Sequence, residues 1–330
     1  MESTAVAVKG ESSPAPSATP RPYSREIDLL LVIYLTVIVF SILYPTSFFA
    51  WENLRWILNN LAADGIVAVG MMALMIAGVF DLSVGSMISM VGVLTGWLLM
   101  RQNWPVLPAV AAGLAAAALG GWVNGMLVAR ARVNALITTL GTLGIFAGIA
   151  LLVGGPSIVN LPRSFTVFGQ TELLGLQLPV WFMLGLAATA HYLLRHTRFF
   201  RQLYYVGSNK KAARLSGIRV ERMQVLAFTL SGLIAGAAGL MFAARFSTAV
   251  SNAGLGTELR VITAVILGGA SLSGGKGSIA GALIGVFFIA LIQSTLLTAD
   301  VDPYWHSIVV GVILILAVVL DSVQNRARES

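Results

Sequence analysis

VNALITTLGTLGIFAGIALLVGG, residues 133–155, is a run of 23 residues without one charged side chain. A helix needs about 20 mostly apolar residues to cross the hydrocarbon core of a bilayer. This stretch therefore predicts a membrane-spanning helix, and similar runs recur along the rest of the chain.

The composition agrees with that interpretation. The chain has 330 residues, of which 57% are apolar or aromatic and only 11% are charged, with a mean hydropathy of +0.85. Soluble domains average about 25% charged residues, so these values exclude a soluble enzyme, a nucleic-acid-binding domain and a disordered chain. Continuous apolar runs also argue against a membrane β-barrel, whose strands alternate apolar and polar residues. We expect an all-α polytopic membrane protein, embedded in membrane lipid and without a nucleic-acid partner.

About ten transmembrane helices are expected from the apolar runs. The predicted spans are 27–46, 56–80, 84–100, 106–129, 133–155, 178–195, 223–244, 259–270, 278–297 and 305–321. Segments 84–100 and 259–270 are short or flanked by Gly-rich turns, so either is alternatively a broken or re-entrant element.

The Lys and Arg residues predict the orientation. With ten spans and the N-terminus inside, sixteen of the 21 basic residues lie on the inner side. The outer side receives Arg55, Arg101, Arg163, Arg245 and Arg260. Cytoplasmic loops of membrane proteins are enriched in Lys and Arg, so both termini are expected in the cytoplasm.

Three regions follow from this pattern. Residues 1–25 are rich in Ser, Pro and Ala and lack the apolar core of a signal peptide, so they predict a disordered cytoplasmic tail. Residues 26–322 form the transmembrane domain, with a basic cytoplasmic loop at 196–222, and residues 323–330 form a short cytoplasmic tail. Small-xxx-small pairs, such as Gly121/Gly125 and Gly232/Gly236, indicate close helix packing inside one bundle or, alternatively, between two copies.

The basic loop contains NKKAARLSGI, residues 209–218. Asn209 is a good N-cap, and Gly217 is a good residue to end the short helix between them. A short amphipathic helix on the face of a membrane protein suits docking into a groove of another protein.

Two further motifs resemble each other. They are GVFDLSVGS at 78–86 and LGGASLSGGKGS at 267–278. Matching Gly78 to Gly268, and Leu82–Ser83 to Leu272–Ser273, indicates an internal repeat, as in many transporter folds. The second motif is not a phosphate-binding loop, because Gly277 rather than Ser or Thr follows Lys276.

Polar side chains within or beside the spans are candidates for a translocation path. Asp81 stands out, because an acid between two apolar runs is costly at depth and is either functional or a helix cap at the membrane edge. The candidate path residues are Asn60, Asp81, Ser83, Asn124, Asn134 and Thr138. The sequence offers no catalytic set, no metal site and no cofactor site, since it lacks Cys and its three His are scattered.

Together these residues support a family resemblance. The chain from about residue 50 onward resembles the permease subunit of ribose-type monosaccharide ABC importers of bacteria. The resemblance rests on GVFDLSVGS at 78–86, NALITTLGT at 134–142, GSNKKAARLSGI at 207–218 and GTELRVITAVILGGASLSGGKGS at 256–278. Val79-Phe80 departs from the Gly-Ile that the family usually carries at this place.

The resemblance implies a multi-pass protein of the bacterial inner membrane. It implies three partners: a cytoplasmic ABC ATPase, a second permease copy or paralogue, and a periplasmic sugar-binding protein. ATP hydrolysis by the separate ATPase then drives import of a pentose, hexose or deoxysugar by alternating access. It further implies that the ATPase contacts the coupling residues Asn209, Ala212, Ala213, Arg214, Ser216 and Gly217.

Other functions remain open at this point. A permease of a branched-chain amino-acid or autoinducer-2 importer shares the general architecture. An intramembrane enzyme would need paired acids or a Ser–His or Ser–Lys arrangement, which the sequence does not show. A stand-alone channel has no need of a docking helix for an ATPase.

Overall fold

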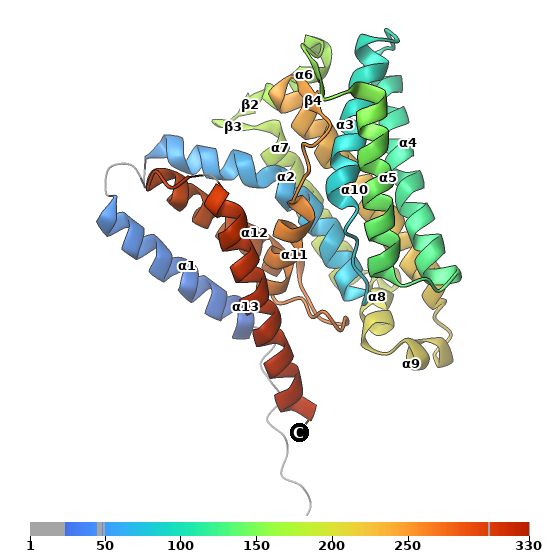
Figure 1. Ribbon diagram of the computed structural model, residues 1–330. Coiled ribbons are helices and arrows are strands. Elements are labelled where there is room, and N and C mark those ends of the chain that lie inside the picture. Colours follow the sequence, from blue (N-terminus) through green and yellow to red (C-terminus); the bar gives the residue numbers. More distant parts are fainter. Residues whose placement is uncertain (1–23, 45–47, 49, 303, 330) are drawn as a thin grey trace, which may run out of the picture.

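The computed structural model describes residues 24–44, 48, 50–302 and 304–329 (Figure 1). All but the last two residues of the expected tail at 1–25 lie outside the described residues. The described chain is mainly helical, as the sequence predicts. Its helices are α1 (Ser24–Leu43), α2 (Trp51–Ile76), α3 (Val84–Met100), α4 (Val106–Gly125), the π-helical turn η1 (Met126–Arg130), α5 (Ala135–Gly154), α6 (Arg163–Gln170), α7 (Leu178–His196), α8 (Arg198–Ser208), α9 (Lys210–Leu215), α10 (Val220–Phe246), α11 (Thr257–Leu267), α12 (Ile279–Thr298) and α13 (Tyr304–Glu329).

In the part of the chain that the structure describes, four strands of two or three residues accompany the helices. β1 (Ser157–Val159) pairs antiparallel with β4 (Thr248–Val250), and β2 (Glu172–Leu173) forms a hairpin with β3 (Leu176–Gln177). Both turn residues of the hairpin, Leu174 and Gly175, have positive φ, as a tight two-residue hairpin turn requires.

Five of the described helices are long and apolar enough to cross a membrane. They are α2, α4 continued by η1, α5, α10 and α12, and three shorter apolar helices cover 29–43, 84–100 and 304–319. This confirms a helical membrane protein. The remaining expected spans, 178–195 and 259–270, correspond to α7 and α11, and α11 has only 11 residues.

The centre of the bundle is made by α10, which packs against α2, α3 and α4. Glycines permit the closest approach: a Cβ on Gly232 would lie 2.9 Å from the Cα of Gly121, and a Cβ on Gly125 would lie 2.8 Å from the Cα of Val225. Side chains at these positions would push the helices apart. The small-xxx-small pairs of α4 and α10 therefore serve packing within this bundle.

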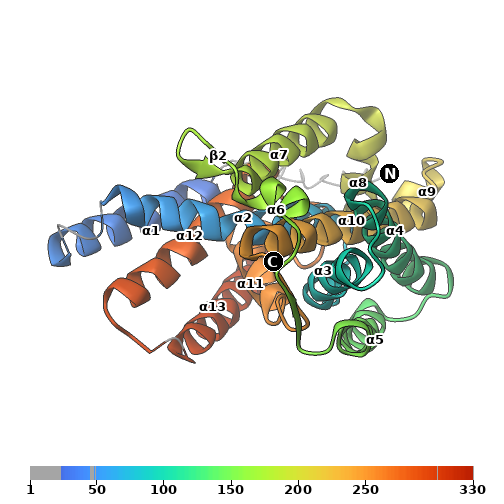
Figure 2. The same cartoon turned by 90° about the horizontal axis from the view of Figure 1, so that it is seen from above.

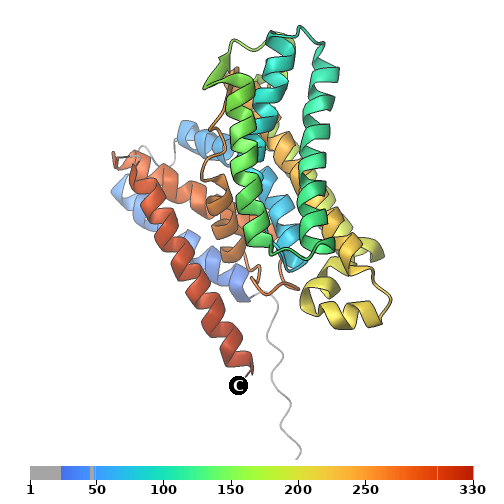
Figure 3. The same cartoon turned by 45° about the vertical axis from the view of Figure 1, so that its right-hand side comes forward.

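The bundle has two distinct ends (Figures 1 and 3). We call the end that carries α8 and α9 the α9 end; the C-terminal end of α13 points the same way. The opposite end, called the β4 end, carries α6 and the four strands. Seen from the β4 end, α2 runs from beside α1 and α12 into the middle of the molecule, between α7 and α11 (Figure 2).

One pass through the bundle is not a continuous helix. After β4, residues 251–256 form successive turns, in which Ala253, Leu255 and Thr257 each donate to the carbonyl oxygen three residues earlier. Helix α11 then covers about 16 Å at 1.5 Å per residue, roughly half of a hydrocarbon core. Arg260, which the sequence assigned to the outer side, lies in the first turns of α11.

The two similar motifs both connect helices at the α9 end, but their match is shifted. Helix α2 ends with Gly78 N–H donating to Met75 and Val79 N–H donating to Leu74. Helix α11 ends with the same pattern at Gly269 and Ala270, a helix-ending motif that favours Gly with positive φ. Gly78 therefore corresponds to Gly269, not to Gly268, and the pairing of Leu82–Ser83 with Leu272–Ser273 is not structural.

Candidate functional site

The most distinctive surface lies at the α9 end, where α8 and α9 protrude from the bundle. Asn209 separates the two helices, and its Oδ1 accepts a hydrogen bond from Ala212 N–H at 3.0 Å. At the other end of α9, Gly217 has φ +81°, and Ile218 N–H donates to Ala213 at 3.0 Å. The predicted cap at Asn209 and helix end at Gly217 are both confirmed.

The residues expected to contact the ATPase mostly face outward. Ala212, Arg214, Ser216 and Gly217 are exposed together with Asn209, whereas Ala213 is buried. Leu215, between them, is 83% exposed.

Helix α8 joins this surface to the transmembrane core. A Cβ on Gly207 would collide with the carbonyl oxygen of Ile76, the last residue of α2. Gly275 N–H donates to that same oxygen at 2.9 Å, and a Cβ on Gly274 would lie 2.6 Å from the Cα of Gly78. We call Gly78, Gly207, Gly274 and Gly275 the glycine junction. Through it, α8 contacts the loops of both similar motifs.

A second contact reinforces the junction. The hydroxyl of Tyr204 in α8 donates to the carbonyl oxygen of Gly277 at 3.0 Å. Burial raises the pKa of Tyr204 above its ordinary value, so the hydroxyl keeps its proton and remains a donor. The sequence did not predict α8 as a separate helix; its signal is the run RFFRQLYYVGS, in which Leu203 and Val206 are buried.

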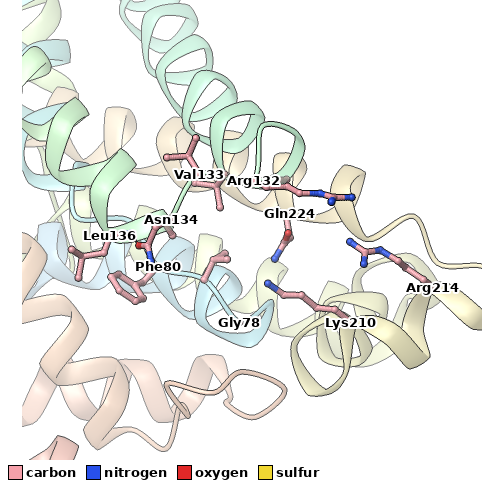
Figure 4. A pocket seen from close by; sticks show the side chains of 13 residues that line it. Gly78, Phe80, Arg132, Val133, Asn134, Leu136, Lys210, Arg214 and Gln224 are labelled. Atoms are coloured by element: carbon pink, nitrogen blue, oxygen red, sulfur yellow. Dashed lines mark hydrogen bonds between the residues drawn. The ribbon is translucent and has the colours of Figure 1, made fainter.

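A cavity of about 690 Å³ lies beside α9, between the 78–80 segment, the start of α5 and α10. Figure 4 shows the side chains of Arg132, Lys210 and Arg214 gathered at one side of it, with Gln224 between them. Burial, and then the nearby charge of Arg214, lower the pKa of Lys210. Arg214 forms an ion pair with Glu221 at 2.6 Å. We call this cavity the basic cavity, because Arg132, Lys210 and Arg214 line it.

The candidate path residues do not form one continuous path. Asp81, Ser83 and Asn124 form a fully buried network. Asp81 Oδ1 accepts from the N–H of Ser83 at 2.8 Å and from its hydroxyl at 2.6 Å. Asn124 Nδ2 donates to Ser83 Oγ at 2.9 Å and to Asp81 Oδ2 at 3.3 Å. These contacts fasten the start of α3 to α4: Asp81 binds the N–H of Ser83, the N-cap residue of α3, and among the described residues no side chain caps the helix itself.

The other three candidates are dispersed. Asn134 caps α5 through Leu136 N–H at 2.8 Å and lines the basic cavity. Thr138 is buried one turn further along α5. Asn60 lies in the half of α2 nearer the β4 end, where its Oδ1 accepts from Arg245 Nη1 at 3.3 Å.

Sequence reasoning missed a charged contact between two of the apolar segments. Arg260 in α11 pairs with Asp64 in α2, with 3.0 Å between Arg260 Nε and Asp64 Oδ2. The available signal was an acid within the apolar run 56–80 and an arginine within the short run 259–270. Among the described residues, no group of His, Cys, Asp or Glu is arranged to hold a metal ion.

Comparison with known proteins places these features in context. The family model for the branched-chain amino acid transport system / permease component matches residues 54–318. The ribose import permease protein RbsC of Escherichia coli K12 is 38% identical over 308 residues, covering 92% of this chain and 95% of the relative. The autoinducer 2 import system permease protein LsrC of Shigella flexneri is 34% identical, with 90% and 87% covered. The L-arabinose transport system permease protein AraH of Escherichia coli K12 is 32% identical, with 91% and 92% covered. No solved structure matches the chain significantly.

Proposed function

The chain belongs to the family of branched-chain amino acid transport system permease components, and on that premise we propose that it is the membrane-spanning permease of an ATP-driven monosaccharide importer. The observation that carries the proposal is the identity to a ribose import permease along nearly the full length of both chains. The same relation supports a transport subunit rather than an enzyme, with ATP hydrolysis performed by a separate subunit.

The α9 end supports a docking site for that ATPase. It offers a protruding capped helix with an exposed Leu215, and through the glycine junction beneath it α8 contacts the C-terminal end of α2 and the middle of the 271–277 loop. A partner that pulls on α8 and α9 would move these loops directly, because glycine contacts leave no flexible side chain between the backbones. We infer that Asn209, Ala212, Arg214, Ser216 and Gly217 belong to this contact, and that the buried Ala213 supports it by packing α9 onto the core.

We further infer that the α9 end is cytoplasmic and that the chain passes the membrane ten times, in a bacterial inner membrane. The passes are α1, α2, α3, α4, α5, α7, α10, the 248–267 segment, α12 and α13. The basic residues of η1, α8 and α9 then face the cytoplasm, as the distribution of positive charge in membrane proteins favours. A second permease copy and a periplasmic binding protein complete the importer.

A second candidate is a permease for branched-chain amino acids, which the description of the matched family favours. Autoinducer 2 is a third cargo, because a permease for it is 34% identical. The identities to the ribose and arabinose permeases place a monosaccharide first.

The proposal is tested by co-purification followed by uptake. The tagged chain, expressed with its native partners, is extracted in mild detergent, and the co-purifying chains are identified by mass spectrometry. We expect an ATPase subunit and a second permease chain. Vesicles containing the complex and its binding protein are then supplied with labelled D-ribose, L-arabinose, autoinducer 2 or leucine. ATP-dependent uptake of leucine alone would replace the sugar proposal, and recovery of the permease alone without stimulated ATPase activity would refute an ATP-driven importer.

A further inference from the structure

Charged and polar side chains from three helices form two groups inside the bundle, one helical turn apart on α2 around its midpoint. We call them the polar layer: Asn60 and Asp64 of α2, Arg245 of α10, and Thr257 and Arg260 of α11. Arg260 binds Asp64 through both Nε, at 3.0 Å, and Nη2, at 3.2 Å. Its Nη2 also donates to Thr257 Oγ1 at 2.8 Å. Arg245 Nη1 donates to Asn60 Oδ1 at 3.3 Å and to the carbonyl oxygen of Asn59 at 2.7 Å.

A purely structural role explains this layer poorly. Removing two charges from water costs several kcal/mol per ion, and well-packed apolar residues often stabilise a core as well as a buried ion pair does. Charged side chains within membrane spans are accordingly rare and mark sites of function. The pair is also not sealed, because 28% of the Arg260 side chain and 18% of the Asp64 side chain remain exposed.

The backbone next to the polar layer also favours a functional site over a purely structural one. Residues 251–256 form turns rather than helix, and Gly254 N–H bonds to Ser89 Oγ at 3.1 Å inside the bundle. Non-helical backbone at membrane depth is tolerated only where protein or water covers it. Asn252 in this segment is exposed, so its polar side chain requires either a partner chain or water. In transporters, interrupted helices at mid-depth commonly form the substrate site.

We propose that the polar layer is the intramembrane binding site for the transported sugar, with Asp64 and Arg260 as its central hydrogen-bonding pair. The inference rests on the proposed function and deepens it. A carboxylate accepts about four hydrogen bonds and a guanidinium donates five, and the contacts above use two of the former and three of the latter. The remaining positions, together with those of Arg245 and Asn60, match neighbouring hydroxyl groups of a neutral sugar, each of which both donates and accepts.

The first experiment is Asp64→Asn in the assembled importer, with the sugar that the wild-type complex transports. We expect uptake to fall about tenfold to a hundredfold, as for loss of a hydrogen bond to a charged group, while ATPase co-purification and basal ATP hydrolysis are retained. The matched control is Glu172→Gln, which removes the carboxylate of the exposed Arg55–Glu172 ion pair at the β4 end and leaves uptake unchanged. Normal uptake in Asp64→Asn would overturn the site while leaving the importer function intact.

Two further measurements keep the proposal testable where Asp64→Asn fails to assemble. The exchange Asp64→Arg with Arg260→Asp preserves the ion pair; a structural role predicts restored uptake, and a binding site predicts an assembled complex without uptake. In addition, Asn252→Cys in this Cys-free chain is expected to react with a water-soluble thiol reagent and to be protected by the sugar, whereas Leu174→Cys, at the exposed tip of the β2–β3 hairpin, is the control that reacts without protection. An Asn252→Cys variant whose thiol the reagent does not reach, or the sugar does not protect, would contradict the proposal.

Discussion

The backbone of Gly207 in α8 lies directly against the carbonyl oxygen of Ile76, the last residue of α2. No side chain larger than hydrogen fits between them, so a displacement of α8 is passed to α2 without an intervening flexible group. The same oxygen accepts the N–H of Gly275 at 2.9 Å, which ties the loop before α12 to the same point. We expect this junction to link the docking surface to the membrane helices.

Gly207→Ala tests the junction. The added methyl group must displace the backbone of α2 or of the 271–277 loop, and overpacking of this kind costs about 1–3 kcal/mol. We expect a lower melting temperature in detergent, and reduced uptake per molecule of ATP hydrolysed in the assembled importer. Gly185→Ala in α7 is the control, because a Cβ there meets no atom within 4 Å. Equal effects of the two substitutions would show that the junction has no special role.

The N-cap of α9 gives a second prediction. Asn209→Ala removes the acceptor for Ala212 N–H, and such a loss costs about 1 kcal/mol of helix stability. We expect faster amide exchange across 210–215 and weaker binding of the ATPase subunit. Asn209→Asp retains an acceptor oxygen and is expected to restore both. If Asn209→Ala accelerates exchange without weakening the ATPase complex, then α9 is not the docking helix.

Asp81→Asn addresses the buried network. The Asp81 carboxylate accepts hydrogen bonds from the N–H and the hydroxyl of Ser83 and from the Asn124 amide. An asparagine has one acceptor oxygen instead of two and cannot accept all three. A buried donor therefore loses its partner, at a cost of about 1–3 kcal/mol. We expect a lower melting temperature, with normal uptake by the protein that remains folded. A loss of uptake at unchanged melting temperature would instead support a role for Asp81 in the translocation path.

The sequence predicted most helices because apolar runs of fixed length are a strong signal in a membrane protein. The expected segment 84–100 has the same bounds as α3, and α9 followed from the capping preferences of Asn209 and Gly217. The interruption before α11 was less visible, since the turns at 251–256 depend on distant acceptors, the hydroxyl of Ser89 and the carbonyl oxygen of Pro156.

Contacts between residues far apart in the chain could not be predicted from the sequence. Nothing in the local pattern connects Asp64 with Arg260, 196 residues apart, or Gly207 with both motif loops. The shifted match between Gly78 and Gly269 has a similar cause. The motifs were aligned by a few identical residues, whereas the hydrogen-bond pattern defines where each helix ends. Local helix caps could therefore be predicted from the sequence, whereas the packing that assembles the site could not.

The basic cavity leads to a chemical prediction. Burial and the charge of Arg214 lower the pKa of Lys210 below its ordinary value of 10.5, so in mildly alkaline buffer more of its amine is neutral than for an ordinary lysine. Arg214→Ala removes the like charge, which raises the pKa and decreases the neutral fraction. We expect slower acylation of Lys210 in Arg214→Ala, measured by mass spectrometry, with the neighbouring Lys211 as the internal reference. An unchanged ratio of the two rates would show that Arg214 does not act on Lys210.

The orientation of the molecule is tested by two single cysteines at opposite ends. Lys211→Cys lies on the exposed surface of α9, and Leu174→Cys lies at the tip of the β2–β3 hairpin, where Leu174 is 79% exposed. The chain has no cysteine of its own, so each variant reports one position. With the α9 end in the cytoplasm, a membrane-impermeant thiol reagent added to spheroplasts labels the Leu174→Cys variant at once and the Lys211→Cys variant only after the membrane is opened. The reverse order would place the basic helices outside, against the usual distribution of positive charge, and would remove the docking surface from any cytoplasmic ATPase.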